Sequence, residues 1–275
     1  MTTTTGPSAK LRTGFIGLGS QGGPMAERML TAGFALTIWA RRAEVAEEWL
    51  EKGASAAGSV AELGAACDHV GVCVVDDAGV AQVCDELIPA MRGGSLLAIH
   101  ATILPESCEE LATRCAARGI AFLDAPVSGG GPAASAGTLT VMCGGMADAL
   151  EQARSVLDSF AGTIVHLGPA GSGQRAKIVN NALLAANMGL AHAAANAGAT
   201  LGIDKTALMD LIKASSGRSF GQEVYARLPS PAAFAHGAPL LAKDVGLLTA
   251  VLADNADAGL LAAAANHFLG PATAG

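Results

Sequence analysis

The sequence predicts an α/β protein in two parts, a doubly wound sheet followed by an all-α domain. Short apolar runs alternate with helix-length segments from Leu11 to about His166, as in a sheet covered by helices on both faces. The pattern changes after Gly168, because residues 173–201 contain no proline and very few β-branched residues. The length of 275 residues suits two domains, since a domain usually takes about 100 to 200 residues.

The expected strands are near-continuously apolar, which is typical of parallel strands between two helix layers. They are residues 15–16, 35–39, 69–75, 95–99, 121–125, 138–143 and 163–167. The expected helices between them are residues 24–32, 43–52, 60–66, 80–91, 105–118 and 147–160. The next helix, 173–201, would be about 40 Å long at about 1.5 Å per residue, which suits an interdomain spine better than a crossover. We therefore expect domains 1–167 and 168–275.

Composition excludes several classes of protein. Hydrophobic residues make up 51% and charged residues 15%, which rules out a disordered chain. The net charge is −7 and no basic run exceeds Arg41-Arg42, so no nucleic-acid partner is expected. No apolar stretch reaches the ~20 residues of a membrane span. The start, Met1 to Ser8, lacks the pattern of a secretory signal, and we expect a cytoplasmic protein without a membrane partner.

The six cysteines are scattered singly and form no C-x-x-C pair. This spacing fits neither a zinc site nor a dense disulfide framework. We expect reduced, mostly buried thiols and no metal.

A glycine-rich turn follows the first expected strand and opens the first helix. It reads Gly17, Leu18, Gly19, Ser20, Gln21, Gly22, the G-x-G-x-x-G pattern of a Rossmann-type dinucleotide-binding domain. The first glycine permits the tight turn, the second lets the backbone approach a pyrophosphate, and the third brings helix and strand together. The helix N-terminus then offers free N–H groups to the anion.

The end of the second expected strand indicates which dinucleotide binds. It reads Trp39-Ala40-Arg41-Arg42, without the acidic residue that would bind the ribose hydroxyls of NAD. Two guanidiniums suit the 2′-phosphate of NADP. The sequence favours NADP, and NAD remains open because either arginine can instead be a solvated loop residue.

Two further segments carry candidate reaction chemistry. In Asp124 to Gly131 the backbone N–H groups of Gly129 and Gly130, with the Ser128 hydroxyl, suit a carboxylate; a plain glycine-rich turn is the alternative. In the second segment, Lys177 and Asn181 lie four apart and share one helix face. A lysine on a solvated face is the alternative there.

Together these segments resemble the β-hydroxyacid dehydrogenase family. This group contains 3-hydroxyisobutyrate dehydrogenases, tartronate semialdehyde reductases, and reductases of glyoxylate or of succinic semialdehyde. The resemblance runs from about Thr13 to Leu248. Its motifs, in order, are the cofactor loop 17–26, the substrate motif 124–131, the catalytic motif 171–181 and Lys243-Asp244. Departures at Gln21, Val75 and His100-Ala101 fall on the cofactor wall. His100 is interpreted as a strand-end residue rather than a catalytic one.

The resemblance implies a role for each motif. Lys177 is the catalytic acid/base, and Asn181 orients it or the substrate. The substrate carboxylate binds at Ser128, Gly129 and Gly130. Cofactor residues are Gly17, Gly19, Ser20, Gln21, Gly22, Arg41 and Arg42, with Thr102 and Lys243 beside the nicotinamide. It also implies a homodimer or homotetramer whose helical domain serves the substrate and dimerisation.

The leading hypothesis is an NADP-preferring oxidoreductase acting on a small 3-hydroxy acid or its semialdehyde or keto acid. Imine reductases share the architecture but generally lack the catalytic lysine, so Lys177 counts against them. A 6-phosphogluconate dehydrogenase would carry His-x-x-Lys, where Gln174 precedes Lys177 here. A non-catalytic NADP-binding protein is the third alternative, although it has no evident need for Lys177.

Overall fold

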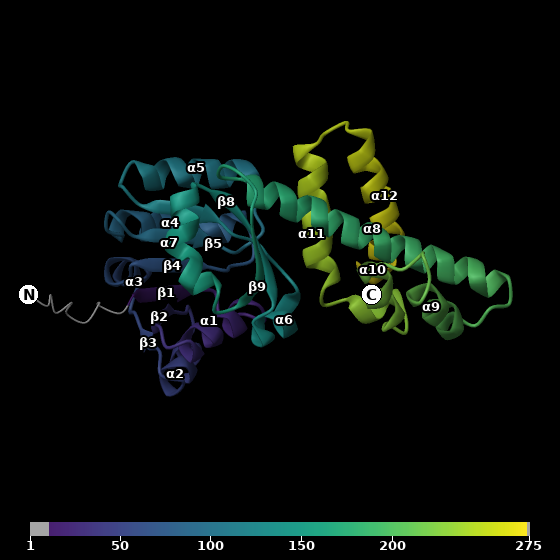
Figure 1. Ribbon diagram of the computed structural model, residues 1–275, viewed down its shortest axis with the longest axis horizontal. Coiled ribbons are helices and arrows are strands. Elements are labelled where there is room, and N and C mark those ends of the chain that lie inside the picture. The colour runs from purple at the N-terminus through teal and green to yellow at the C-terminus, as the bar shows by residue number, and fades with distance from the viewer. Residues whose placement is uncertain (1–10, 274–275) are drawn as a thin grey trace, which may run out of the picture. The chain divides into compact units, whose positions relative to one another are not determined.

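The computed structural model describes residues 11–273, and the chain divides into two units, Met1–Lys177 and Ile178–Gly275. Figure 1 labels most of their helices and strands. The segment Met1 to Ser8, on which the expectation about a secretory signal rests, lies outside the described residues. The predicted α/β class is confirmed, since a mostly parallel sheet with helices precedes a purely helical part.

The sheet has the strand order β3-β2-β1-β4-β5-β6-β8-β7, with β9 beside β8. The strands are β1 Arg12–Ile16, β2 Ala35–Trp39, β3 Ser55–Ala56, β4 His69–Val72, β5 Leu96–Ile99, β6 Ala121–Asp124, β7 Val127–Ser128, β8 Leu139–Gly145 and β9 Ala161–His166. The pairs from β3 through to β6 are parallel, and β8 runs antiparallel to β6 and β7. The order reverses at β1 and β4, where open α/β sheets bind ligands at the carboxyl ends of their strands.

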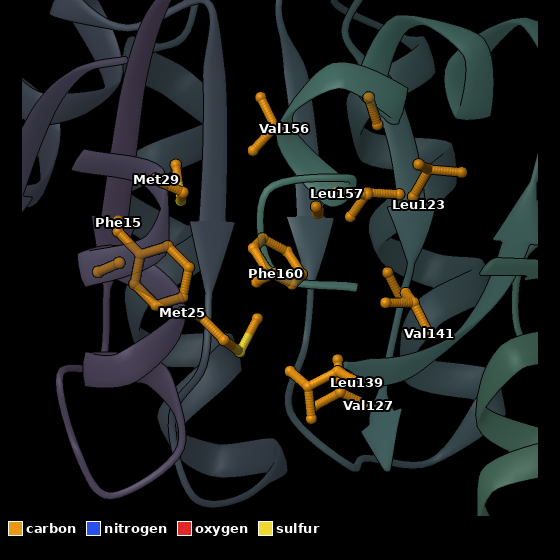
Figure 2. Packing of buried hydrophobic residues seen from close by; sticks show 14 of the residues in the cluster. Phe15, Met25, Met29, Leu123, Val127, Leu139, Val141, Val156, Leu157 and Phe160 are labelled. Carbon is orange, nitrogen blue, oxygen red and sulfur yellow. The ribbon is translucent and has the colours of Figure 1, made fainter. Parts of the chain in front are cut away.

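Helices cover both faces of this sheet, because neighbouring strand residues point to opposite sides. The helices of this unit are α1 Gly22–Thr31, α2 Ala43–Glu51, α3 Val60–Ala66, α4 Asp77–Ala90, α5 Pro105–Ala116, α6 Gly130–Ala136 and α7 Ala147–Leu157. Phe15 packs in a core with α1, α2, α6 and α7, whereas Ile16 packs with α3, α4 and α5. Figure 2 shows part of the first core, where Phe15, Met25 and Phe160 gather.

Two buried histidines lie within this first unit. His100 directly follows β5, as expected of a strand-end residue, and its Nδ1 is 2.9 Å from the Ala125 carbonyl oxygen. Its ring stacks on Phe15 and meets Phe160 edge-on. Burial lowers the pKa of His100 to about 4 and, together with nearby His100, that of His69 to about 3. Both rings are therefore neutral near pH 7.

The elements differ from the sequence expectation in a few places. Strands β3 and β7 and helix α6 were not expected. Helix α4 begins at Asp77 rather than at residue 80, because the Asp76 carboxylate accepts from Gly79 N at 2.9 Å and caps the helix. Strand β4 ends at Val72 rather than at residue 75. The cysteines are free thiols and, except for partly exposed Cys73, are buried.

The long helix α8, Ser172–Thr200, begins in the first unit and continues into the second. The helices that follow are α9 Lys205–Lys213, α10 Phe220–Ala226, η1 Pro231–Phe234, α11 Ala238–Val251 and α12 Ala256–Thr273. Small residues allow α8 to approach its neighbours closely: a Cβ at Gly189 would overlap the Ala264 carbonyl oxygen on α12. Within residues 11–273, no helix is both long enough and apolar enough to cross a bilayer.

Candidate active site

The cofactor loop joins β1 to α1 and depends on glycine at its turn. Gly17 has a φ of +99°, and a Cβ there would overlap the Cys73 carbonyl oxygen. A Cβ at Gly22 would overlap the Gly17 carbonyl oxygen, so this glycine holds helix against strand. Gly19 has open space where its side chain would be. The loop is tightly packed on one side and open on the other, as an approaching pyrophosphate requires.

The N-terminus of α1 is suited to an anion. Its N-cap residue, Gln21, makes no side-chain capping bond, and the first turn holds no acidic residue. Ser20 is exposed and Gln21 partly exposed beside it. Gly23 N already donates to the Gly19 carbonyl oxygen at 2.8 Å and Pro24 has no N–H, so an anion here is attracted mainly by the positive end of the helix dipole.

A cavity of about 670 Å³ adjoins this loop. Gly17 and Gly19 line it, together with Arg41 and Arg42 from the end of β2. Arg41 donates to Gln82 Oε1 at 3.4 Å, and both arginines are exposed. Among residues 11–273, Asp76 is the only carboxylate that lines the cavity, and it already caps α4. The size and the donors of this cavity fit the adenosine end of a dinucleotide.

The substrate motif is more ordered than a glycine-rich turn. Val127 and Ser128 form β7, and α6 begins at Gly130. Gly129 has a φ of +127°, which turns the chain between the two elements. A Cβ at Gly131 would lie 2.7 Å from the Ser20 carbonyl oxygen, so this motif directly contacts the cofactor loop. Ser128 is partly exposed, and Gly129 and Gly130 are exposed.

Lys177 lies next to the substrate motif. It is 8% exposed on α8, and its Nζ donates to the Val127 carbonyl oxygen at 2.7 Å. Because Val127 immediately precedes Ser128, this bond places the ammonium beside the predicted carboxylate site. The alternative of a lysine on a solvated face is therefore wrong.

Two residues of this unit are functional candidates that sequence reasoning assigned no role. Asp124 is fully buried, and its carboxylate accepts from Gly171 N at 2.8 Å and from Gln174 N at 2.9 Å. Burial raises the pKa of Asp124, and these backbone bonds oppose that rise. The Gln174 side chain is also fully buried and bonds to the loop around Thr102. Neither contact can be read from the sequence, since the partners lie 47 to 73 residues apart.

In the second unit, Asn181 and Lys243 meet through Asp244. Asn181 is 8% exposed and donates from Nδ2 to Asp244 Oδ2 at 2.6 Å. Lys243 Nζ lies 3.1 Å from Asp244 Oδ1, a distance typical of an ion pair although the angles do not meet those of a hydrogen bond. In the sequence, the Lys243-Asp244 dipeptide was the feature that could have identified Asp244 as a functional residue.

The predicted site residues therefore form two groups. In the first unit, Lys177 joins the substrate motif, and that motif touches the cofactor loop. In the second unit, Asp244 joins Asn181 to Lys243. Helix α8 carries a member of each group, because Lys177 and Asn181 lie one turn apart on it. Among residues 11–273, no three His, Cys, Asp or Glu side chains form a group that could hold a metal ion.

Comparison with known proteins identifies the family. A family model described as the NAD-binding domain of 6-phosphogluconate dehydrogenase matches residues 12–168. A second, described as the NAD-binding part of NADP-dependent 3-hydroxyisobutyrate dehydrogenase, matches residues 171–273. The mitochondrial 3-hydroxyisobutyrate dehydrogenase of Mus musculus is 34% identical over 255 residues, covering 87% of this chain and 75% of that protein.

A bacterial relative and a solved structure agree with this assignment. The NAD-dependent L-serine dehydrogenase of Pseudomonas aeruginosa is 39% identical over 253 residues, covering 85% of this chain and 82% of its own. The structure of Mycobacterium tuberculosis 3-hydroxyisobutyrate dehydrogenase with L-serine superposes with a TM-score of 0.85 at 29% identity, covering 96% of this chain and 94% of that one. The chain belongs to the β-hydroxyacid dehydrogenase family of NAD(P)-dependent oxidoreductases that act on CH–OH groups.

Proposed function

We propose that this enzyme interconverts a small 3-hydroxy acid and its semialdehyde or keto acid, with NADP preferred over NAD. The observation that carries the proposal is the bond from Lys177 Nζ to the Val127 carbonyl oxygen, directly beside Ser128. It joins a proton-transfer group to a site suited to a carboxylate. The names of two relatives, a 3-hydroxyisobutyrate and an L-serine dehydrogenase, both denote 3-hydroxy acids.

The glycine loop and the arginine pair hold the dinucleotide in this proposal. The backbone of the loop, Gly17, Gly19, Ser20, Gln21 and Gly22, binds the pyrophosphate at the positive end of the α1 dipole. Arg41 and Arg42 line the adjoining cavity and bind the 2′-phosphate. Thr102 and Lys243 contact the nicotinamide, as the family resemblance implies. Bound dinucleotide supplies the hydride acceptor for the acid and the hydride donor for the aldehyde.

Ser128, Gly129 and Gly130 bind the substrate carboxylate. The Ser128 hydroxyl and the exposed backbone N–H groups that follow it are the donors, and no acidic side chain stands among residues 125–131. The N-terminal end of α6 adds a favourable dipole. This arrangement fixes the acid end of the substrate while the 3-hydroxyl reaches toward Lys177.

Lys177 moves the proton. One N–H of its amine is held by the Val127 carbonyl oxygen, which fixes Nζ in place. In oxidation the lone pair of the neutral amine accepts the hydroxyl proton of the substrate. In reduction the ammonium returns a proton to the carbonyl oxygen. Asn181 donates from its side-chain amide to Asp244, which holds it in place. It orients the substrate or Lys177 and does not itself exchange a proton.

In this proposal the helical domain 168–275 serves substrate binding and assembly, and the domain 1–167 binds the cofactor. Apolar side chains at Val179, Leu183 and Leu190 are 47 to 59% exposed on α8. Such a stripe suits a contact between copies of the chain. We propose a homodimer or homotetramer, which light scattering after size exclusion measures directly.

A substrate panel tests the proposal. Purified enzyme would be assayed with NADP and NAD against 3-hydroxyisobutyrate and L-serine, and with NADPH against glyoxylate, small semialdehydes and a cyclic imine. The proposal expects turnover of at least one hydroxy acid or aldehyde acid, with a higher kcat/KM for the phosphorylated cofactor. Turnover of the imine alone would support an imine reductase. Cofactor binding without turnover would support a non-catalytic protein.

A further inference from the structure

The Gln174 side chain holds the loop on which Thr102 lies. Its Nε2 donates to the Ala101 carbonyl oxygen at 2.8 Å, and its Oε1 accepts from Ile103 N at 3.2 Å. These two peptide groups lie on either side of the Thr102 Cα. One amide therefore fixes the backbone both before and after the residue that would contact the nicotinamide.

Asp124 fixes the start of helix α8 on the other side of Gln174. Its two carboxylate oxygens accept from Gly171 N and Gln174 N. The fit is close, because a Cβ at Gly173 would lie 2.8 Å from Asp124 Oδ2, and a Cβ at Gly144 would overlap Oδ1. The charge lies at the positive end of the helix dipole. The position of Gln174 along the helix axis is thus set by a rigid contact.

One turn of α8 consequently contacts the chain at three strands of the sheet, β5, β6 and β7. Gln174 reaches the loop after β5, its backbone is held by Asp124 at the end of β6, and Lys177 reaches Val127 on β7. Gln174 and Lys177 are three residues apart, so they lie on the same side of the helix. A second anchor holds the β5 loop independently, since Leu104 N donates to Asp77 Oδ1 at 2.9 Å.

We propose that Gln174 is a positioning residue that sets Thr102 at a fixed place relative to Lys177. The inference rests on the proposed function, in which Thr102 contacts the nicotinamide and Lys177 moves the proton. Hydride and proton must reach adjacent atoms of one substrate, so the two residues must be held in register. A displacement of about 1 Å between reacting groups can cost on the order of 10²-fold in rate.

The first experiment removes both side-chain bonds with Gln174→Met, which keeps the length of the side chain. We expect kcat to fall roughly tenfold to a hundredfold, with KM for the hydroxy acid and Kd for NADPH within about threefold of native. Gln222→Met is the matched control, because Gln222 is 3% exposed and donates to the Met209 carbonyl oxygen at 3.0 Å in the second unit. It loses a comparable buried bond, and its kcat should stay within about twofold of native.

A readout without turnover follows the Ile103 amide by hydrogen exchange in the protein without cofactor. In the native chain this amide is bonded to Gln174 Oε1, and Gln174→Met should exchange it at least about tenfold faster. The Leu104 amide, bonded to Asp77, should change less. Unchanged exchange at Ile103, or unchanged kcat in a variant that binds NADPH, would overturn the inference.

A second variant keeps the inference testable if Gln174→Met does not fold. A protonated Gln174→Glu side chain can accept from Ile103 N and donate to the Ala101 carbonyl oxygen, whereas the ionised form cannot donate. The titratable groups facing this position are the Asp124 carboxylate, the Cys108 thiol and Lys177 on the same helix. Burial and Asp124 both favour the protonated form, and charged Lys177 opposes them. The ratio of variant to native kcat should therefore be near one at pH 6, either after rising from pH 8 or throughout the range, and a ratio that stays low at every pH would contradict the inference.

Lys177→Ala distinguishes a failure of the proposed proton transfer from a failure of the positioning role of Gln174. If Lys177→Ala keeps native turnover, the proposed proton transfer is wrong, whatever Gln174 does. If Lys177→Ala loses turnover while Gln174→Met keeps it, only the role of Gln174 is wrong.

Discussion

The nucleotide pocket and the reaction group of the first unit are built differently. Arg41 and Arg42 stand exposed at the rim of an open cavity. Lys177, Gln174 and Asp124 are buried and hydrogen-bonded to backbone groups. In the proposed function, cofactor choice would therefore depend on side chains that can change without disturbing the core, whereas the chemistry would depend on groups that the fold itself holds. Substitutions should separate these two kinds of effect.

The largest effect is expected at Lys177. Lys177→Ala should lower kcat by roughly 10² to 10⁴, the usual contribution of a positioned acid or base. NADPH should still bind with near-native affinity, because the cavity beside the glycine loop is not lined by Lys177. Stopped-flow turnover and fluorescence titration of NADPH measure the two quantities. A variant that keeps most of its turnover would contradict the assignment.

The second effect concerns cofactor choice. The double substitution Arg41→Ala, Arg42→Ala should raise KM for NADPH by more than about tenfold, since each charge-assisted bond to phosphate contributes about 1.5 to 3 kcal/mol. KM for NADH, which lacks the 2′-phosphate, should change little. kcat at saturating cofactor should also stay close to native. Equal changes for NADPH and NADH would show that the arginines do not recognise the phosphate.

A smaller effect is expected at the carboxylate site. Ser128→Ala removes one hydroxyl donor to the charged substrate carboxylate, and such a bond usually contributes about 1.5 to 3 kcal/mol. KM for the hydroxy acid should rise roughly tenfold to a hundredfold, and the preference for the acid over its amide should fall. Cofactor Kd serves as the control and should not move. An unchanged acid-to-amide ratio would place the substrate anion elsewhere.

The last prediction concerns stability, not activity, and tests the buried core of the first unit. Burial lowers the pKa of His69 to about 3 and that of His100 to about 4 from the ordinary value of 6.5. Below about pH 6.5 the two histidines of the unfolded chain therefore bind protons, while those of the folded chain stay neutral until the pH approaches their lowered pKa values. The free energy of unfolding therefore has its full value above pH 6.5. It declines below that pH, by up to about 1.4 kcal/mol per pH unit for each histidine.

Urea unfolding between pH 7.5 and 5 measures this dependence. His69→Leu should reduce the slope of unfolding free energy against pH. The same substitution should not lower stability at pH 7.5 by much, because neither ring nitrogen of His69 has a hydrogen-bond partner among the described residues. Identical slopes in the native chain and the variant would contradict the assigned pKa.

Much of the fold could be predicted because its elements have strong local patterns. The apolar run 35–39 and the amphipathic segment 60–66 have the bounds of β2 and α3. Strand β7 could not be predicted because it is only two residues long, and helix α6 could not because a segment made mostly of glycine and alanine shows neither period. Positive φ angles at Gly129 and Gly130, together with packing of α6 on α1, give that segment its shape.

The candidate site was predictable as a set of residues but not as a network. Motif order suggested Ser128 and Lys177, and the helical spacing suggested Asn181. The bonds that hold them involve Asp124, Gln174 and Asp244, whose partners are distant in sequence. The contacts of Asp124 and Gln174 arise only when the sheet brings the chain around β5, β6 and β7 together, and that of Asp244 only when α11 packs on α8.

The turnover of Lys177→Arg tests the central claim most directly. Arginine keeps the positive charge and can donate to the Val127 carbonyl oxygen, but its pKa above about 12 prevents it from releasing a proton. With NADPH and substrate binding confirmed by titration, we predict a kcat within about tenfold of that of Lys177→Ala. A Lys177→Arg enzyme with about half or more of native turnover would show that the residue contributes charge alone and would contradict proton transfer by Lys177.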